Sequence, residues 1–193
     1  MTAAICRLRW RMAIKATIHK ALVQFSDLDR NAYADHSLTI ARHPSETDER
    51  MMVRLLAYVL NAPPDSDNGQ LEFGKDMWDP DEPCLIQKDL TGLPVHWIDI
   101  GQPDEKRMLR ASGRVLRTTV YAYGTTSAAW WAKTASKVSR AKNLSVWEVP
   151  PKQSGELAGV AERGMNLQVT LQEETIYVGS GARSVEIQLQ RLL

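Results

Sequence analysis

Residues 84–100 read CLIQKDLTGLPVHWIDI and carry the strongest folding signal in the chain. Two apolar runs, residues 84–86 and 95–100, flank the sequence DLTG at residues 89–92. Asp in the first position and Gly in the fourth position are typical of a type I turn. Two apolar runs around such a turn predict a β-hairpin.

The register of this hairpin can be counted outward from the turn. We set Asp89 opposite Gly92. Because side chains alternate along a strand, the count then places Glu82 opposite Asp99 at the open end of the hairpin. Directly opposed Cβ atoms lie about 4.5–5.5 Å apart, and like charges there are destabilising. A divalent cation with oxygen ligands would remove that cost, so we predict a metal site here, with Asp81 beside the pair.

Length and composition limit the class of protein. The chain of 193 residues is long enough for one domain with its own core. The formal net charge of +1 gives no overall field that favours nucleic acid or a membrane. The two cysteines, Cys6 and Cys84, fit neither a disulfide framework nor a zinc site, and they indicate a reducing, cytoplasmic setting. No apolar run approaches the roughly 20 residues of a membrane helix, so we expect no membrane contact.

The first residues differ from the rest of the chain. Residues 1–11 are basic and have no apolar stretch typical of a secretory signal. We expect them to be a disordered or non-native extension, with Met12 as a candidate true start; a basic arm for nucleic acid is the alternative. Residues 12–193 are expected to form a single domain.

Hydrophobic periodicity predicts the remaining elements. Residues 13–25 and 33–41 alternate as a long antiparallel hairpin. A helix begins near Ser45 and ends before Pro63, because an acidic first turn precedes an apolar stripe at helical spacing. We predict a strand at residues 71–73, a helix from the cap Asp104 to about Val115, a strand–helix–strand crossover at 118–123, 126–139 and 144–149, a helix at 154–163, and a β-meander at 165–171, 175–178 and 184–190.

The predicted helix after Asp104 carries a row of arginines. Arg107, Arg110, Arg114 and Arg117 follow one another at spacings of 3, 4 and 3 residues, which places them along one helical stripe. Such a stripe either contacts phosphates or forms a solvated helix face, and the sequence leaves both interpretations open.

The sequence resembles the YaeQ family over nearly its whole length from Met12. The resemblance implies an α/β fold: a mixed β-sheet flanked by helices, built on a PD-(D/E)XK nuclease core with modified topology and added β-hairpins. Pro80 and Asp81, followed 18 residues later by Asp99, look like that nuclease signature. The segments that carry the family resemblance are MAIKATI at 12–18, SDLDR at 26–30, ARHPSETDERMM at 41–52, DEP at 81–83, WIDIGQPDEKR at 97–107 and NLSVW at 143–147.

The resemblance also implies a site. In nucleases of that superfamily, acidic residues hold Mg²⁺ ions that polarise a phosphodiester and lower the pKa of the attacking water. Gly101 stands where the nuclease signature has a lysine, so Gln102, Lys106, Arg107 or Lys137 would have to take that role. The implied ligands for Mg²⁺ or Mn²⁺ are Glu46, Glu49, Asp81, Glu82 and Asp99. The implied catalytic residues are Asp99, Glu82, Glu49, Gln102 and Lys106.

Two functional hypotheses follow from these residues. The first is a Mg²⁺-dependent phosphodiesterase or nuclease-like protein acting on nucleic acid. The second is a catalytically inactive protein of the same fold that binds nucleic acid or a protein partner. Glu46 and Glu49 also match the dipole of a helix start, and the acids near the hairpin also match salt bridges to Arg50, Arg54 or Lys106. DNA versus RNA and the oligomeric state are left open.

Overall fold

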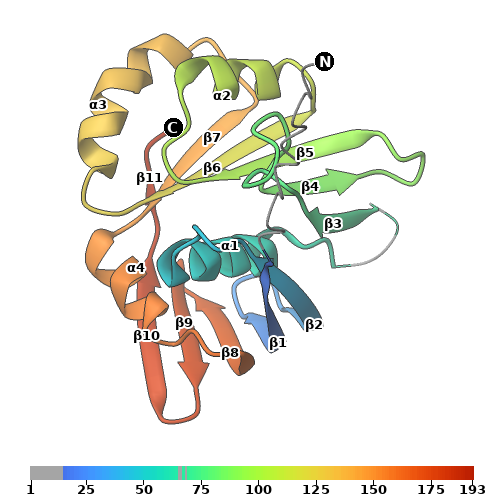
Figure 1. Ribbon diagram of the computed structural model, residues 1–193, viewed down its shortest axis with the longest axis vertical. Helices are drawn as coiled ribbons and strands as arrows, with labels where there is room; N and C mark the ends of the chain where they lie inside the picture. Colours follow the sequence, from blue (N-terminus) through green and yellow to red (C-terminus); the bar gives the residue numbers. More distant parts are fainter. Residues whose placement is uncertain (1–14, 65–66, 68) are drawn as a thin grey trace, which may run out of the picture.

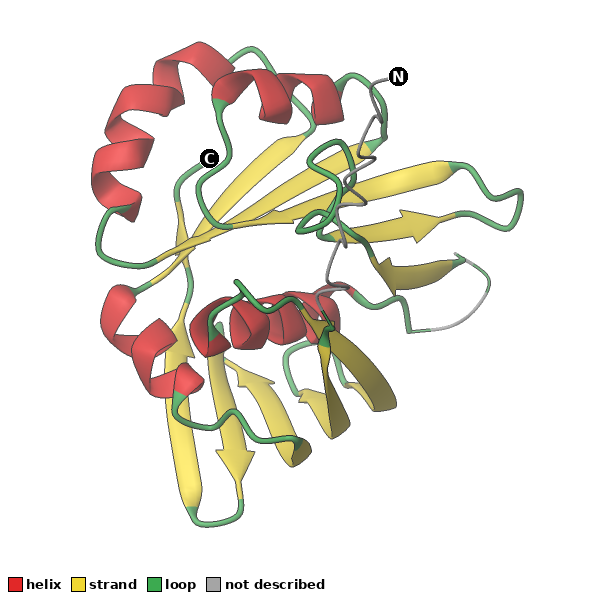
Figure 2. Cartoon of the chain, viewed as in Figure 1, coloured by secondary structure: helices red, strands yellow, loops and turns green. Residues whose placement is uncertain are grey.

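The computed structural model describes residues 15–64, 67 and 69–193, and these residues form eleven strands and four helices in two mixed β-sheets. The predicted extension at residues 1–11 lies outside the described residues. Helix α1 (Asp48–Asn61) lies between the two sheets, while α2 (Glu105–Ser112) and α3 (Ser127–Val138) lie on the outer face of one sheet (Figures 1 and 2). The predicted mixed α/β fold is confirmed, but it has two sheets in place of the one expected.

The first sheet has the strand order β10-β9-β8-β1-β2. The predicted N-terminal hairpin is confirmed, with Thr17 opposite Arg42 and Asp27 opposite Ala32. The predicted C-terminal meander is also confirmed, and its first strand pairs in parallel with β1. The strands are β1 (Thr17–Asp27), β2 (Ala32–Arg42), β8 (Gly164–Gln172), β9 (Thr175–Ser180) and β10 (Arg183–Gln188).

The second sheet has the strand order β11-β7-β6-β5-β4-β3. The predicted crossover is confirmed, because β6 and β7 pair in parallel and α3 connects them. A second parallel connection runs from β5 through α2 to β6. The strands are β3 (Gln70–Phe73), β4 (Leu85–Lys88), β5 (Pro94–Ile100), β6 (Arg117–Tyr123), β7 (Leu144–Val149) and β11 (Gln190–Arg191).

The hairpin β4–β5 forms as predicted, but its register differs. The turn is closed by the Gly92 N–H, which donates to the Asp89 carbonyl at 3.0 Å. Hydrogen bonds from the Thr91 hydroxyl and the Leu93 N–H lower the pKa of Asp89. Two offsets of one residue separate the observed register from the count. In the turn the Asp89 N–H donates to the Leu93 carbonyl at 2.9 Å, and a bulge between Gln87 and Lys88 adds the second offset, so that Ile86 faces Trp97 and not Val95. The predicted opposition of Glu82 and Asp99 is therefore wrong.

Helix α1 is apolar on nearly every side because both sheets pack against it. Its buried residues run without a break from Met51 to Ala57, which is typical of a helix inside a core. The main apolar cluster contains α1 together with the inner faces of both sheets. A second cluster, which includes Met108, Val120 and Val138, lies between the second sheet and helices α2 and α3.

Local signals set most helix ends. Asp104 caps α2 as predicted, since its carboxylate accepts a hydrogen bond from the Arg107 N–H at 2.7 Å. However, α2 ends at Ser112, so the predicted arginine stripe does not continue as a helix to Arg117, which begins β6. Helix α4 (Pro151–Ala158) begins and ends earlier than predicted, with proline at its first position, where the missing N–H costs nothing. Among the described residues, no helix has the length and apolar character needed to span a membrane.

Candidate functional site

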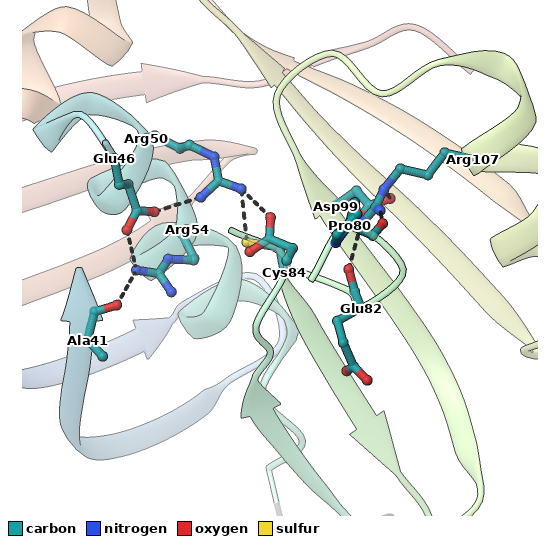
Figure 3. A network of polar contacts seen from close by, with 10 residues as sticks. Ala41, Glu46, Arg50, Arg54, Pro80, Glu82, Cys84, Asp99 and Arg107 are labelled. Carbon is teal, nitrogen blue, oxygen red and sulfur yellow. Dashed lines mark hydrogen bonds and ion pairs between the residues drawn. The ribbon is translucent and has the colours of Figure 1, made fainter. Parts of the chain in front are cut away.

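The predicted acidic residue Glu46 lies in a buried ion-pair network before α1. Its two carboxylate oxygens accept hydrogen bonds from Arg50 and Arg54, each at 2.7 Å (Figure 3). The Glu46 side chain is 1% exposed and that of Arg54 is 5% exposed. Thr47 caps the helix by accepting from the Arg50 N–H at 3.1 Å, which fixes the direction in which Arg50 leaves the first turn.

Arg50 extends this network to the connection between β3 and β4. Its guanidinium pairs with Asp76 and also lies 3.8 Å from the Cys84 sulfur. Burial raises the pKa of the Cys84 thiol, so Cys84 is a neutral thiol at neutral pH. The two acids, Glu46 and Asp76, and the two arginines, Arg50 and Arg54, therefore neutralise one another in a region from which water is largely excluded.

A second ion pair holds Asp99 near the carboxyl end of β5. Arg107 of α2 donates through Nε and one Nη to the two carboxylate oxygens, at 2.8 and 2.7 Å. Such a bidentate pair is among the strongest polar contacts in proteins. Arg107 also donates to the carbonyl oxygens of Pro80 and Glu82, so it binds the loop before β4 to the end of β5 (Figure 3).

The other two acids of the predicted cluster lie at the surface. The carboxylate of Glu82 is exposed and points away from Asp99 (Figure 3). Asp81 pairs with Arg110 at 2.5 Å, with both side chains more than half exposed. The predicted convergence of these two acids on Asp99 is therefore absent from the described part of the structure.

Glu49 and Gln102 do lie together. Both line a cavity of about 540 Å³ beyond the carboxyl ends of β5 and β6. The Glu49 carboxylate accepts from the Ser154 hydroxyl at 2.5 Å, and the Gln102 amide donates to the Thr126 hydroxyl at 2.8 Å. Lys106, which was predicted to assist them, is an exposed residue of α2 and does not line this cavity.

The donor set does not fit a Mg²⁺ site in this arrangement. Glu46 and Asp99 already pair with guanidinium groups, and a cation would have to displace them against their own positive charge. Across residues 15–64, 67 and 69–193, no group of three His, Cys, Asp or Glu side chains is arranged to hold a metal ion.

The backbone at Gly101 favours glycine. Gly101 has φ +105°, a conformation that side chains rarely adopt. A lysine at this position, as the nuclease signature would require, would be strained whatever its side chain contacted. The residue after β5 is therefore suited to a particular backbone turn and not to carrying a lysine.

The sequence indicated the acids of this region and, as an alternative to a metal, salt bridges to Arg50 or Arg54. It did not indicate that Arg107 pairs with Asp99 or that Asp76 joins the network. A usable signal was present, because Glu46, Arg50 and Arg54 are four residues apart, and residues at this spacing are neighbours on a helix.

Comparison with known proteins agrees with the predicted resemblance. The family model described as YaeQ protein matches residues 12–189. Uncharacterized YaeQ proteins from Salmonella typhi and Escherichia coli K12 are 41% and 39% identical over 180 residues, which is 92% of this chain and 96% of each relative.

Solved structures give the same result. The crystal structure of the YaeQ protein from Xanthomonas axonopodis pv. citri has 42% identity and a TM-score of 0.85, and covers 92% of this chain and 98% of that one. The structure from Pseudomonas syringae has 39% identity and a TM-score of 0.84, and covers 92% of this chain and 96% of that one. The chain therefore belongs to the YaeQ family.

Proposed function

We propose that this protein binds nucleic acid through the outer face of helices α2 and α3, and that its buried acids stabilise the fold. The observation that carries the proposal is the distribution of charge along the chain. Residues 106–147 contain nine Lys and Arg and no Asp or Glu. Since the whole chain has a net charge of +1, the remaining residues carry a net charge of −8.

The exposed positive residues of α2, α3 and the turns after them belong to elements that cover one face of the second sheet, whereas Arg107 pairs with Asp99 and Arg117 lies on the inter-sheet face. Helices α2 and α3 lie together over the second sheet, where the Trp130 indole N–H donates to the Pro103 carbonyl at 2.9 Å (Figure 1). Two acids at the start of α2 lie near these positive residues. Asp104 caps the helix, and Glu105 pairs with Lys137 at 3.6 Å. The exposed cations of the two helices and the turns that follow them are Lys106, Arg110, Arg114, Lys133, Lys137, Arg140 and Lys142.

Phosphates are the partners that such a face suits best. Lys and Arg side chains neutralise backbone phosphates one by one and release bound counterions, without requiring a base sequence. The contacts need no cavity, only a surface that presents several cations along the direction of the nucleic acid backbone. This binding mode predicts weak sequence preference and a steep dependence of affinity on salt.

The test is fluorescence anisotropy with a labelled 20-base-pair DNA duplex and the matching RNA duplex, titrated at several NaCl concentrations. For each phosphate neutralised on DNA, the log–log slope of affinity against salt is expected to be about −0.9. The double variant Lys133→Gln/Arg140→Gln should reduce the magnitude of this slope by about 2 and weaken binding about tenfold or more near 0.1 M salt. The matched control, Lys20→Gln/Lys152→Gln, removes two exposed cations outside this face and should change affinity less than about twofold.

Two results would contradict the proposal. One is the absence of binding to either duplex at about 50 mM salt, a condition in which non-specific electrostatic binding is strong. The other is equal weakening by the two double variants, because that would reflect net charge and not a defined face. Binding to a protein partner in place of nucleic acid would appear as the first of these results.

The second hypothesis, a Mg²⁺-dependent phosphodiesterase, is tested with the same duplexes. One observation favours it: Glu49 and Gln102 line the same cavity. Glu49 accepts a hydrogen bond from a hydroxyl group, whereas Glu46 and Asp99 pair with guanidinium groups elsewhere. Cleavage that requires Mg²⁺ or Mn²⁺ and is lost in both Glu49→Gln and Asp99→Ala would support hydrolysis. We expect no such cleavage, because an ion would first have to displace Arg107 from Asp99.

A further inference from the structure

A groove of about 1,130 Å³ lies between the two sheets, beside the C-terminal end of α1, and is separate from the features considered above. Its floor is the inner face of β6 and β7 with the C-terminal strand β11, and its opposite wall is the turn between β1 and β2. None of the predicted site residues lines it. Its volume reaches the upper end of the range typical of small-molecule sites, roughly 300–1,000 Å³.

The floor of the groove presents aromatic rings between two cations. Along β6, Arg117, Thr119 and Tyr121 are alternate residues and therefore share a face. Across the sheet, Tyr121 pairs with Trp147 of β7, and Trp147 pairs with Arg191 of β11. From strand geometry, Arg117 lies roughly 13 Å along the strands from the row of Tyr121, Trp147 and Arg191.

Among the side chains that the structure describes, the contact seen for the Arg117 guanidinium is with a neutral group. Its guanidinium donates to His96 Nδ1 at 2.9 Å, and His96 Nε2 lies 2.8 Å from the Thr119 hydroxyl. This arrangement places the imidazole proton on Nε2 and leaves the ring neutral. Burial, together with the nearby Arg117, lowers the pKa of His96 to about 3, so the ring is neutral at physiological pH. A neutral partner orients the guanidinium without cancelling its charge.

Arg191 makes no ion pair with a side-chain acid in the part of the chain that the structure describes. Its guanidinium lies over the Trp147 ring at 5.8 Å, and its Nε donates to an oxygen of the C-terminal residue Leu193 at 3.2 Å. Because this oxygen belongs to a carboxyl group, it partly engages Arg191, and Arg117 is the main cation of the groove. Three acids also line the groove: Asp27 pairs with Arg30 at 3.8 Å, Asp29 accepts from the backbone N–H groups of the turn between β8 and β9, and Glu174 is exposed.

We propose that this groove binds an organic anion with a planar apolar body. The anionic group pairs with Arg117, whose side chain is exposed and held from below by His96. The body lies over Trp147 and against Tyr33, which is 63% exposed on the opposite wall. A cation held by a neutral partner, with a second cation and exposed aromatic surface in the same cavity, complements such a molecule.

The probe is 8-anilinonaphthalene-1-sulfonate, which combines a planar apolar body with one negative charge, followed by its fluorescence on binding. Its neutral counterpart, N-phenyl-1-naphthylamine, has the same body without the sulfonate. We expect one saturable sulfonate site, a loss of affinity of about tenfold or more in Arg117→Gln, and a smaller loss in Arg191→Gln. Affinity for the neutral probe should stay within twofold in both variants. Tyr33→Ala should weaken both probes.

The matched control is Arg114→Gln, which removes an exposed arginine close to Arg117 in sequence but outside the groove. It should leave the affinity for both probes unchanged, as should Lys133→Gln/Arg140→Gln on the other side of the sheet. Circular dichroism of each variant checks the fold. Sulfonate affinity that is unchanged in both groove arginine variants, or that falls equally in Arg114→Gln, would overturn the proposal. Equal affinity of the wild type for the two probes would also overturn it, because the occupant would then be merely apolar.

Discussion

Replacing Glu46 with Gln should destabilise the protein by about 3 kcal/mol, at the lower end of the range for breaking a buried ion pair. Glu46 is 1% exposed in its side chain and bridges Arg50 and Arg54 at 2.7 Å each. Glutamine keeps the size and part of the hydrogen bonding but removes the charge. Arg50 retains Asp76 as a partner, whereas Arg54, 5% exposed, is left without a counterion. The loss therefore falls mainly on Arg54.

The measurement is urea unfolding followed by tryptophan fluorescence, with the free energy of unfolding compared at a constant m value. For a chain of this size, about 3 kcal/mol corresponds to a fall in Tm of roughly 6–12 °C. The double variant Glu46→Gln/Arg54→Met should lose at least about 1 kcal/mol less free energy of unfolding than the sum of the two single variants, because it no longer contains the unpaired charge of Arg54. The exposed pair offers a control: Asp81→Asn should cost less than about 1 kcal/mol. A loss below about 1 kcal/mol for Glu46→Gln, or strict additivity, would refute the reasoning.

Three further predictions concern single residues. Burial lowers the pKa of His96 from 6.5 to about 3, so the unfolded chain binds more protons than the folded chain between these pH values. The free energy of unfolding should therefore fall as pH falls from 6.5 to about 3. In denaturant titrations, His96→Gln should reduce the dependence of this free energy on pH by up to about 1 kcal/mol per pH unit. Cys84, which is fully buried with a raised pKa, should not react with a thiol reagent in a Cys6→Ser background until denaturant unfolds the protein; reaction at the rate of a free thiol would contradict this. Gly101→Lys and Gly101→Ala should each cost about 1–3 kcal/mol by thermal unfolding, because the cost comes from the backbone at φ +105°; a neutral Gly101→Lys would show that the backbone relaxes freely.

Features that depend on a few adjacent residues were predictable from the sequence. Asp104 was identified as a helix cap, and the turn of the β4–β5 hairpin was identified from Asp89 and Gly92. In each case the side chain or backbone bonds within three residues of itself, so nothing distant in the chain competes with it. The same holds for the β1–β2 hairpin, whose strands are joined by a turn of four residues.

Features that depend on distant segments were not predictable. The parallel pairing of β1 with β8 joins Lys20 to Gly164, and no local pattern encodes which strands meet. This pairing joins the N-terminal hairpin and the C-terminal meander into the first sheet. The two-residue error in the β4–β5 register has a different cause. The turn closes between Asp89 and Leu93, which accounts for one residue, and the bulge between Gln87 and Lys88 accounts for the other. The bulge depends on how β4 fits between β3 and β5, whereas the count from the turn assumed an unbroken ladder.

The arginine partners of the predicted acids were not predictable for a related reason. Helical spacing placed Arg107 on a face but did not indicate that this face turns toward β5. Arg107 is in the first turns of α2, whose start is fixed by the cap at Asp104, and that position brings its guanidinium onto Asp99. The sequence thus indicated Asp99 as a buried charge but not the arginine that pairs with it.

The arginines and Gly101 together indicate what this region does in the present fold. Arg107 donates to Asp99 and to two carbonyl groups of the loop before β4, while Arg50 joins the start of α1 to the β3–β4 connection. These contacts hold three segments, distant in sequence, around the end of β5. Each guanidinium supplies at its acid the positive charge that a divalent ion would otherwise provide, and like charges at such distances repel. We therefore expect anionic partners to be recognised by other cations, such as the exposed Arg114, Lys133 and Arg140 beside α2 and α3, and Arg117 in the inter-sheet groove.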